Sequence, residues 1–128
     1  EAMEMKGGEL APIYVRVALW LEEEILSGRL PEEERVYSQY QLAEMFTINP
    51  ATAAKGLNIL AGEEIIYKKR GLGMFVAPGA VEKARRKRRE QQLGALVSQL
   101  VREAAMLGVE EEELVEIIHN AREGTKQW

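Results

Sequence analysis

The chain has 128 residues, carries a formal net charge of −4, and contains no cysteine and a single histidine. This composition excludes a disulfide framework, a thiolate metal site and a histidine cluster, and the length suits a small domain with an appendage better than a large catalytic domain. No apolar run approaches the roughly 20 residues that span a bilayer, and the start has no signal-peptide pattern, so we expect a cytoplasmic protein with no membrane partner.

Charge is strongly segregated along the chain. Residues 1–34 carry nine acidic and three basic groups, whereas residues 67–92 carry nine basic groups against two acids. Residues 36–62 carry only Glu44 against Lys55. Because binding to a polyanion depends on local charge more than on the sum, the acidic total does not exclude nucleic acid as a partner.

The first predicted element is a helix over residues 12–27. Its apolar residues recur every four positions, which places them on one buried face: Ile13, Val17, Leu21 and Ile25. Pro12 suits the first helical position, and Gly28 suits a left-handed C-cap. The acidic run at residues 32–34 then predicts an exposed loop.

Two short helices separated by a tight turn follow. Ser38 and Gln41 have the spacing of a capping box, which predicts the start of the first of them. Its expected inward residues are Leu42, Ala43 and Phe46. Asn49 followed by Pro50 predicts the start of the second, because asparagine caps free amides and proline at the first position loses no hydrogen bond.

The second short helix has two distinct faces. Its expected inward residues are Ala53, Gly56, Leu57 and Leu60. Its expected outward residues are Ala51, Thr52, Ala54, Lys55 and Asn58. Small inward residues let a helix cross its neighbour closely, and a thin outward face can enter a DNA major groove.

The remainder of the chain predicts a hairpin and two helices. Two β-prone runs, residues 65–67 and 74–76, are separated by KKRGLG, which indicates a hairpin with a basic, glycine-bearing tip. After Gly79 one long helix is expected to about Met106, followed by a final helix over residues 110–122. Two such helices cannot bury their apolar stripes by themselves, so the stripes must pack on the first domain or on another subunit.

This order of elements is that of a winged helix-turn-helix. We predict a mainly α fold with a small β-hairpin: an N-terminal winged helix-turn-helix DNA-binding domain over residues 12–79, and a short two-helix C-terminal dimerisation domain over residues 80–123. The residues expected in the interface of a homodimer are Leu93, Leu96, Val97, Leu100, Val101, Leu114, Ile117 and Ile118. A dimer formed through the first helix is the alternative.

Each part of this domain has a physical task on double-stranded operator DNA. The first short helix would hold a phosphate at its start, the second would meet base edges, and the hairpin, or wing, would neutralise phosphates and approach a sugar edge closely. The predicted DNA-binding residues are Ser38, Gln39, Tyr40, Asn49, Pro50, Ala51, Thr52, Lys55, Asn58, Lys68, Lys69, Arg70, Gly71 and Gly73. Lys55 is expected to be the leading contact, and the wing lysines are expected to act as mobile point charges.

Two stretches, PIYVRVALWLEEEILSGRL and YSQYQLAEMFTINPATAAKGLNILAGEEIIYKKRGLGMFVAPGA, resemble the DNA-binding domain of the GntR family. Within them, INPATAAKGLN and YKKRGLGMFV are similar to its YtrA subfamily. The resemblance covers residues 12 to about 80, and it implies a bacterial regulator that binds an inverted-repeat operator as a dimer, usually as a repressor. It places the recognition helix on residues 50–58 and the wing tip on Gly71.

The sequence also departs from the family pattern. Many members have Pro-Ser-Glu-Arg at the positions of residues 37–40 and Ser-Arg at the positions of residues 49–50, so two arginines common at the DNA surface are missing. The C-terminal tail is shorter than the ligand-sensing domains of the larger subfamilies. A small-molecule effector therefore stays open.

Other functions have less support in the residues. We predict no enzyme and no cofactor, because there is no phosphate loop and no nucleophile beside a base. We also predict no metal site, and expect His119 to be a partly buried packing residue. The alternative function is a winged-helix adaptor that binds proteins without specific DNA binding. For the basic run at residues 83–89, contact with DNA phosphates and pairing with acidic residues of a partner subunit are equally open.

Overall fold

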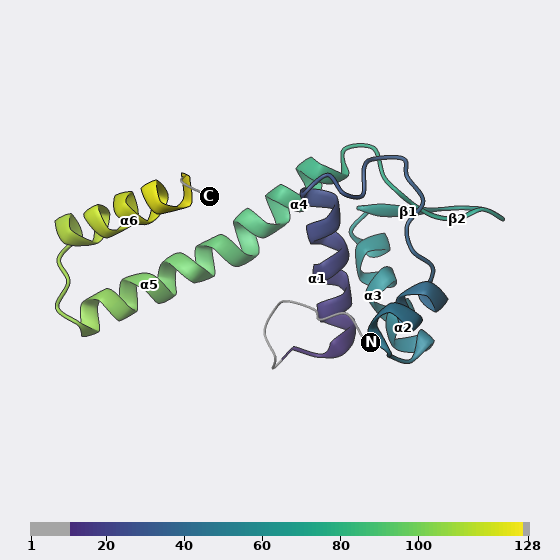
Figure 1. The fold of residues 1–128 in the computed structure, drawn as a ribbon, viewed down its shortest axis with the longest axis horizontal. Helices are drawn as coiled ribbons and strands as arrows, with labels where there is room; N and C mark the ends of the chain where they lie inside the picture. The colour runs from purple at the N-terminus through teal and green to yellow at the C-terminus, as the bar shows by residue number, and fades with distance from the viewer. Residues whose placement is uncertain (1–10, 127–128) are drawn as a thin grey trace. The chain divides into compact units, whose positions relative to one another are not determined.

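The computed structural model describes residues 11–126. Its elements in chain order are α1 (Ile13–Leu26), α2 (Gln39–Phe46), α3 (Pro50–Gly62), β1 (Ile66–Lys69), β2 (Gly73–Val76), α4 (Ala80–Arg88), the π-helical segment η1 (Arg89–Leu93), α5 (Gly94–Met106) and α6 (Glu111–Lys126), shown in Figure 1. The predicted mainly α fold with a small β-hairpin is confirmed.

The chain divides into two compact units, the first ending at Lys87 and the second beginning at Arg88. The first unit reaches beyond the predicted boundary at residue 79, because Ala80 and Ala84 of α4 are fully buried in its core. The role of the second unit in dimerisation stays a prediction.

The core of the first unit forms where α3 packs against both α1 and α2 (Figure 1). Its fully buried side chains include Val17, Leu21, Ile25, Leu42, Leu60, Ile65, Ile66 and Val76. Gly56 is where α3 crosses α1, because an added Cβ would lie 2.9 Å from the carbonyl oxygen of Tyr14. The predicted inward residues of α2 and α3 are all buried, as expected.

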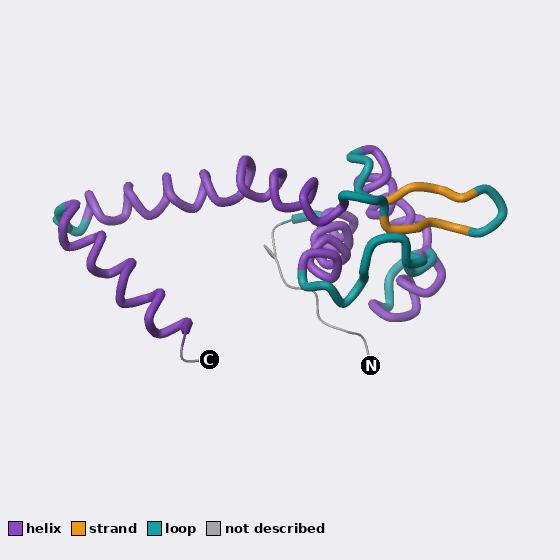
Figure 2. The backbone as a smooth tube through the Cα atoms, turned by 90° about the horizontal axis from the view of Figure 1, so that it is seen from above, coloured by secondary structure: helices purple, strands orange, loops and turns teal. Residues whose placement is uncertain are grey.

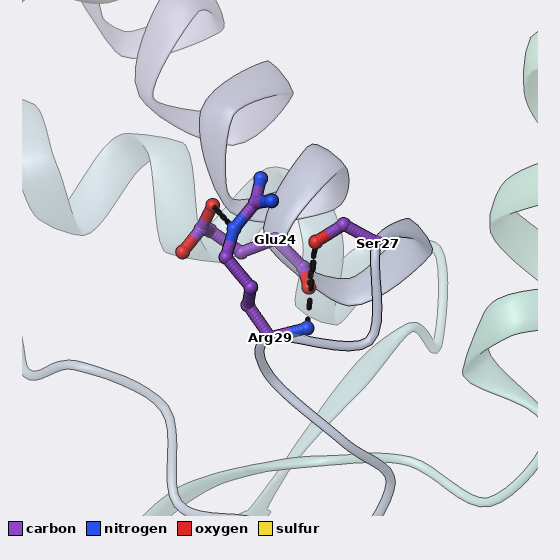
Figure 3. A network of polar contacts seen from close by, with 3 residues as sticks. All are labelled: Glu24, Ser27 and Arg29. Atoms are coloured by element: carbon purple, nitrogen blue, oxygen red, sulfur yellow. Dashed lines mark hydrogen bonds and ion pairs between the residues drawn. The ribbon is translucent and has the colours of Figure 1, made fainter. Parts of the chain in front are cut away.

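Helix α1 begins one residue later than predicted. Pro12 has an extended conformation and is the N-cap, and Ile13 is 44% exposed instead of buried. At the other end Gly28 has φ +84°, as a left-handed cap requires. Figure 3 shows the hydrogen bonds that hold the C-terminal end of α1. The Ser27 hydroxyl donates to the Glu24 carbonyl oxygen at 3.1 Å, and the Arg29 Nε donates to the Glu24 carboxylate at 2.7 Å.

Both predicted helix starts in the helix-turn-helix are confirmed. Gln41 N–H donates to Ser38 Oγ at 3.1 Å, and Ser38 N–H donates to Gln41 Oε1 at 2.8 Å, which is a complete capping box. Asn49 Oδ1 accepts from Ala51 N–H at 2.8 Å, and Pro50 is the first residue of α3. The intervening turn includes Thr47 in the left-handed region, at φ 54°.

The hairpin is broader than the sequence indicated, because residues 33–36 run beside β2. Val36 N–H donates to the Met74 carbonyl at 2.8 Å, and Val76 N–H donates to the Glu34 carbonyl at 2.9 Å. The acidic run is exposed, as predicted, and lies in a turn in which the backbone of Glu33 and Glu34 hydrogen-bonds to Val76 of β2. Figure 2 shows β1 and β2 extending away from the helices of this unit.

The second unit contains α5 and α6, which turn back on each other after Gly108, at φ +70°. The long helix expected from residue 81 to Met106 is interrupted by η1, which the pattern did not predict, and α6 extends beyond the predicted end at residue 122. His119 is exposed in the single chain, so it has no packing role within it, and burial against a partner stays a prediction. Among residues 11–126, no helix is long and apolar enough to cross a membrane.

Candidate nucleic-acid interface

The outward face of α3 is the centre of the candidate interface. Of the five residues predicted to face outward, Ala51, Lys55 and Asn58 are exposed, and Thr52 and Ala54 are half-buried. Lys55 is the single charged residue of the helix. A face with short side chains, hydrogen-bonding groups and one cation can approach base edges without repelling phosphates.

The ammonium group of Lys55 lies over an aromatic ring from α1. Its Nζ lies 5.4 Å from the ring centroid of Tyr14, within the range of a cation–π contact. At an exposed site such a contact contributes about 0.5–1 kcal/mol. It narrows the range of positions that this long side chain takes, so the side chain would lose less entropy on binding a partner.

The start of α2 supplies a second group of donors. The Ser38 hydroxyl oxygen accepts an amide within the capping box, which leaves its own proton to donate outward. Gln39 is half-buried and Tyr40 is exposed. Because the first amides of a helix have no intrahelical acceptor, this helix start is suited to a phosphate oxygen.

The register of the hairpin separates the two lysines of β1 onto opposite faces. Lys68 pairs with Met74, on the face that carries the buried residues Ile66 and Val76. An open groove of about 880 Å³ beside α3 is lined by Asn58 from the helix and by Lys68 from the strand. Lys68, which is exposed, therefore lies on the side of the wing that adjoins the outward face of α3.

Lys69 lies on the other face of the wing and is held there. Its Nζ is 4.2 Å from the ring centroid of Phe75 and 5.7 Å from that of Tyr67, and 3.8 Å from Glu33 Oε2. The Tyr67 hydroxyl donates to the same Glu33 oxygen at 3.0 Å. The expectation that the wing lysines are mobile point charges is therefore wrong for Lys69, because the register places both aromatic rings beside it.

The tip of the wing contains the three remaining predicted wing residues. Arg70 and Gly71 are exposed, and Gly71 has φ +77° with open space where a Cβ would be. Gly73, at φ +109°, lies against Arg35, whose Nε would be 3.2 Å from an added Cβ. Arg35 was not among the predicted residues, because its position beside the wing depends on backbone hydrogen bonds between residues 33–36 and β2.

Part of the basic run on α4 is paired within the chain, an outcome that neither sequence alternative included. Lys87 Nζ donates to Glu22 Oε2 at 2.7 Å and to Glu63 Oε1 at 2.8 Å. Lys83 Nζ donates to the Glu64 carbonyl at 3.0 Å. These bonds join α4 to α1 and to the end of α3.

Lys87 is the ionisable group that this pairing perturbs most clearly. Burial lowers the pKa of its ammonium group, but the hydrogen bonds and charges of Glu22 and Glu63 raise this pKa by more than burial lowers it. The pKa of Lys87 therefore lies above its ordinary value of 10.5. Arg85 also has an intrachain partner, since its Nη1 donates to Glu82 at 3.0 Å. Lys83, Arg85 and Lys87 therefore each have a partner within the chain, and contact of the basic run with DNA or with a partner subunit stays a prediction.

The second unit exposes most of the predicted dimer interface. Leu93, Leu96, Val97, Leu100 and Val101 of α5 and Ile117 and Ile118 of α6 are exposed, and Leu114 is half-buried. The structure contains one chain, so the burial of these residues by a partner subunit stays a prediction. Within residues 11–126, no group of three or more histidine, aspartate or glutamate side chains could hold a metal ion.

Residues 13–76, with this helix-turn-helix and wing, match the family described as bacterial regulatory proteins, gntR family. The chain belongs to the GntR family. It therefore carries the DNA-binding winged helix-turn-helix of a family of transcription regulators, and that family is not one of enzymes.

Two curated relatives are repressors. The chain is 32% identical over 73 residues to the HTH-type transcriptional repressor NagR of Bacillus subtilis (strain 168), over 57% of this chain and 30% of that protein. It is 31% identical over 67 residues to the histidine utilization repressor of Pseudomonas aeruginosa, over 52% of this chain and 27% of that protein. The matched part is thus less than a third of each curated relative.

Solved structures extend the similarity beyond the winged helix. A putative transcriptional regulator of the GntR family from Bacteroides thetaiotaomicron has a TM-score of 0.75 and 31% identity, covering 89% of this chain and 99% of that chain. BusR of S. agalactiae, in complex with its busAB-promotor DNA, has a TM-score of 0.55 and 26% identity, covering 91% of this chain and 58% of that chain.

Proposed function

We propose that this protein is a cytoplasmic transcriptional repressor that binds an inverted-repeat operator as a homodimer. The observation that carries the proposal is the outward face of α3, where Lys55 and Asn58 are exposed and where Asn58 lines one groove together with the exposed Lys68 of the wing. The similarity to BusR, solved with promoter DNA, and to two repressors supports the same function. The motifs INPATAAKGLN and YKKRGLGMFV favour the YtrA subfamily.

In this proposal each element makes a different kind of contact. Helix α3 enters the major groove, where Ala51, Thr52, Lys55 and Asn58 meet base edges and nearby phosphates. The start of α2 binds a phosphate through free amides and the side chains of residues 38–40. The wing contacts the neighbouring minor groove through Lys68, Arg70 and the tip glycines. The exposed apolar stripe of α5 and α6 joins two subunits, and each subunit binds one half-site.

The proposal is tested by binding to DNA across a salt series. The full chain is titrated by fluorescence anisotropy onto a duplex from the region upstream of its own gene, and onto a random duplex of the same length. Binding through phosphates should weaken linearly on a log–log plot, with a slope of about −0.9 for each phosphate neutralised. A protein-binding adaptor would show no preference for the upstream duplex.

Replacing Lys55 with alanine tests the leading contact. The variant should keep the fold, because Lys55 is exposed, and should lose about tenfold or more in operator affinity, since a good base contact contributes about 1–3 kcal/mol. Arg102→Ala is the matched control, because it removes one exposed cation from α5, outside the candidate interface. Equal affinities for all three proteins would remove Lys55 from the interface.

A further inference from the structure

The apex of the wing presents a single apolar side chain. Leu72 is 60% exposed between two glycines of positive φ, Gly71 at +77° and Gly73 at +109°. Leu72 N–H donates to the Lys69 carbonyl at 2.9 Å, which closes the turn. Gly73 lies against the guanidinium of Arg35, so the base of the turn is held on one side. The apex is therefore a defined turn that holds Leu72 outward, away from the core of the unit.

A single exposed leucine is common on a protein surface and does not by itself indicate a binding site. The residues around Leu72 are what indicate a partner. Lys68 in β1 and Arg70 at the start of the turn are both exposed, and residues 67–76 include no acidic residue. An apolar tip beside exposed cations fits a partner with anionic edges and an apolar surface between them. The minor groove of DNA has this chemistry, with phosphates on its rims and sugar edges and bases between them.

We propose that Leu72 enters the minor groove as an apolar wedge while Lys68 and Arg70 bind the phosphates on its rims. This inference rests on the proposed function, in which the wing lies on operator DNA. Apolar side chains that enter the minor groove partly unstack a base step and bend the duplex toward the major groove. Pyrimidine–purine steps are the easiest to deform. Leu72 thus favours operators with a flexible step beneath the wing, without a hydrogen bond to any base.

Three substitutions in the full chain separate an apolar wedge from a charge effect. Leu72→Ala removes the wedge, Leu72→Met keeps an apolar side chain of similar size, and Leu72→Lys replaces it with a cation. None should disturb the fold, because Leu72 packs on no core residue, and circular dichroism checks this. The DNA probe is a duplex selected from a random library by the unsubstituted full chain, with a dye at each end.

Affinity, salt dependence and bending are measured on this probe by anisotropy and by energy transfer between the dyes. Leu72→Ala should bind about tenfold more weakly, as expected for losing the burial of most of a leucine side chain, with an unchanged salt slope and a smaller bend. Leu72→Met should keep both affinity and bend. Leu72→Lys should steepen the salt slope without restoring the bend.

The outcomes distinguish failure of the wedge from failure of the proposed function. If the full chain binds the selected duplex and Leu72→Ala matches it in affinity and bend, the wedge is overturned and operator binding stands. If selection yields no duplex that the full chain prefers to random DNA, operator binding and the wedge both fail. Recovery of the bend by Leu72→Lys would also overturn the wedge, since charge alone would then account for it.

Discussion

Adjacent lysines in one strand have different surroundings in this wing. Alternation along β1 turns Lys68 toward the side of α3 and Lys69 toward Tyr67 and Phe75. A lysine that stacks on an aromatic ring and lies near a carboxylate has much of its charge satisfied within the chain. Position in the register, more than residue type, therefore decides which lysine is available to DNA.

Replacing each lysine with alanine should separate these roles. Lys68→Ala should weaken binding to operator and random duplex by similar factors and flatten the salt dependence by up to about 0.9 per chain, because it removes a phosphate contact. Lys69→Ala should leave DNA affinity nearly unchanged and lower the free energy of unfolding by about 0.5–1 kcal/mol through loss of the cation–π contact. Anisotropy and urea unfolding measure the two effects. Equal losses of DNA affinity would show that both lysines contact DNA.

At the scale of the elements, the close crossing of α1 and α3 depends on the glycine at position 56. Gly56→Ala would bring a methyl group to 2.9 Å from both the Tyr14 carbonyl oxygen and Val17 Cγ1. We expect a loss of about 1–2 kcal/mol in the free energy of unfolding, since overpacking outweighs the gain of about 1 kcal/mol in helix propensity. Urea unfolding measures it.

Gly62 at the end of the same helix is the matched control. An added Cβ there meets nothing within 4 Å, and its φ lies outside the left-handed region. Gly62→Ala should be neutral or slightly stabilising. A Gly56→Ala variant as stable as Gly62→Ala would mean that the helices adjust their separation at little cost.

The link between α4 and the rest of the first unit depends on Lys87, whose partner Glu22 has no exposed side-chain surface. Lys87→Met leaves that carboxylate buried without this cation and should cost about 3 kcal/mol at neutral pH. Arg85→Met is the control on the same helix. Its ion pair with Glu82 is largely exposed and should change stability by less than about 1 kcal/mol.

The same ion pair predicts a pH dependence of stability. The folded-state pKa of Lys87 lies above its ordinary value of 10.5, so its stabilisation is complete below that value and is lost as pH rises through the raised pKa. Urea unfolding of the parent protein and of Lys87→Met should therefore converge above pH 10.5. A constant difference between them at all pH values would contradict a contribution from the charge of Lys87.

Local signals in the sequence predicted the helix-turn-helix well, and long-range pairing explains most of what they missed. The capping box at Ser38 and the Asn49–Pro50 start depend on neighbours within a few residues, so both could be predicted from spacing alone. The placement of Arg35 beside the wing and the pairing of Lys87 with Glu22 depend on residues far apart in the sequence. No periodicity indicates such contacts.

In the candidate site too, the features set by local sequence were predicted and those set by long-range pairing were not. The outward face of α3 follows from helical periodicity: Ala51, Lys55 and Asn58 are exposed, while Thr52 and Ala54 are half-buried. The different surroundings of the two wing lysines follow from the hairpin register, which composition does not specify. The basic run on α4 looked like one surface because its charges are adjacent in sequence, yet Lys83 and Lys87 are held by Glu22, Glu63 and the Glu64 carbonyl.

At the scale of the whole molecule, the exposed apolar stripe of α5 predicts that the working unit is a dimer. Leu96 and Leu100 are 60% and 39% exposed in the single chain, and an apolar stripe of this kind on a soluble helix marks an interface. Introducing Leu96→Glu together with Leu100→Glu should give a monomer at micromolar concentration by analytical ultracentrifugation, because two carboxylates would be buried against apolar side chains. Ala95→Glu is the control, since Ala95 lies on the opposite face of α5 by helical periodicity and is exposed, and this variant should stay dimeric. The monomer should still bind a single half-site but lose the gain in affinity that two linked half-sites provide, which is commonly about a hundredfold or more. A double variant that stays dimeric would place the interface elsewhere, with α1 as the alternative, and would separate dimerisation from the C-terminal helices altogether.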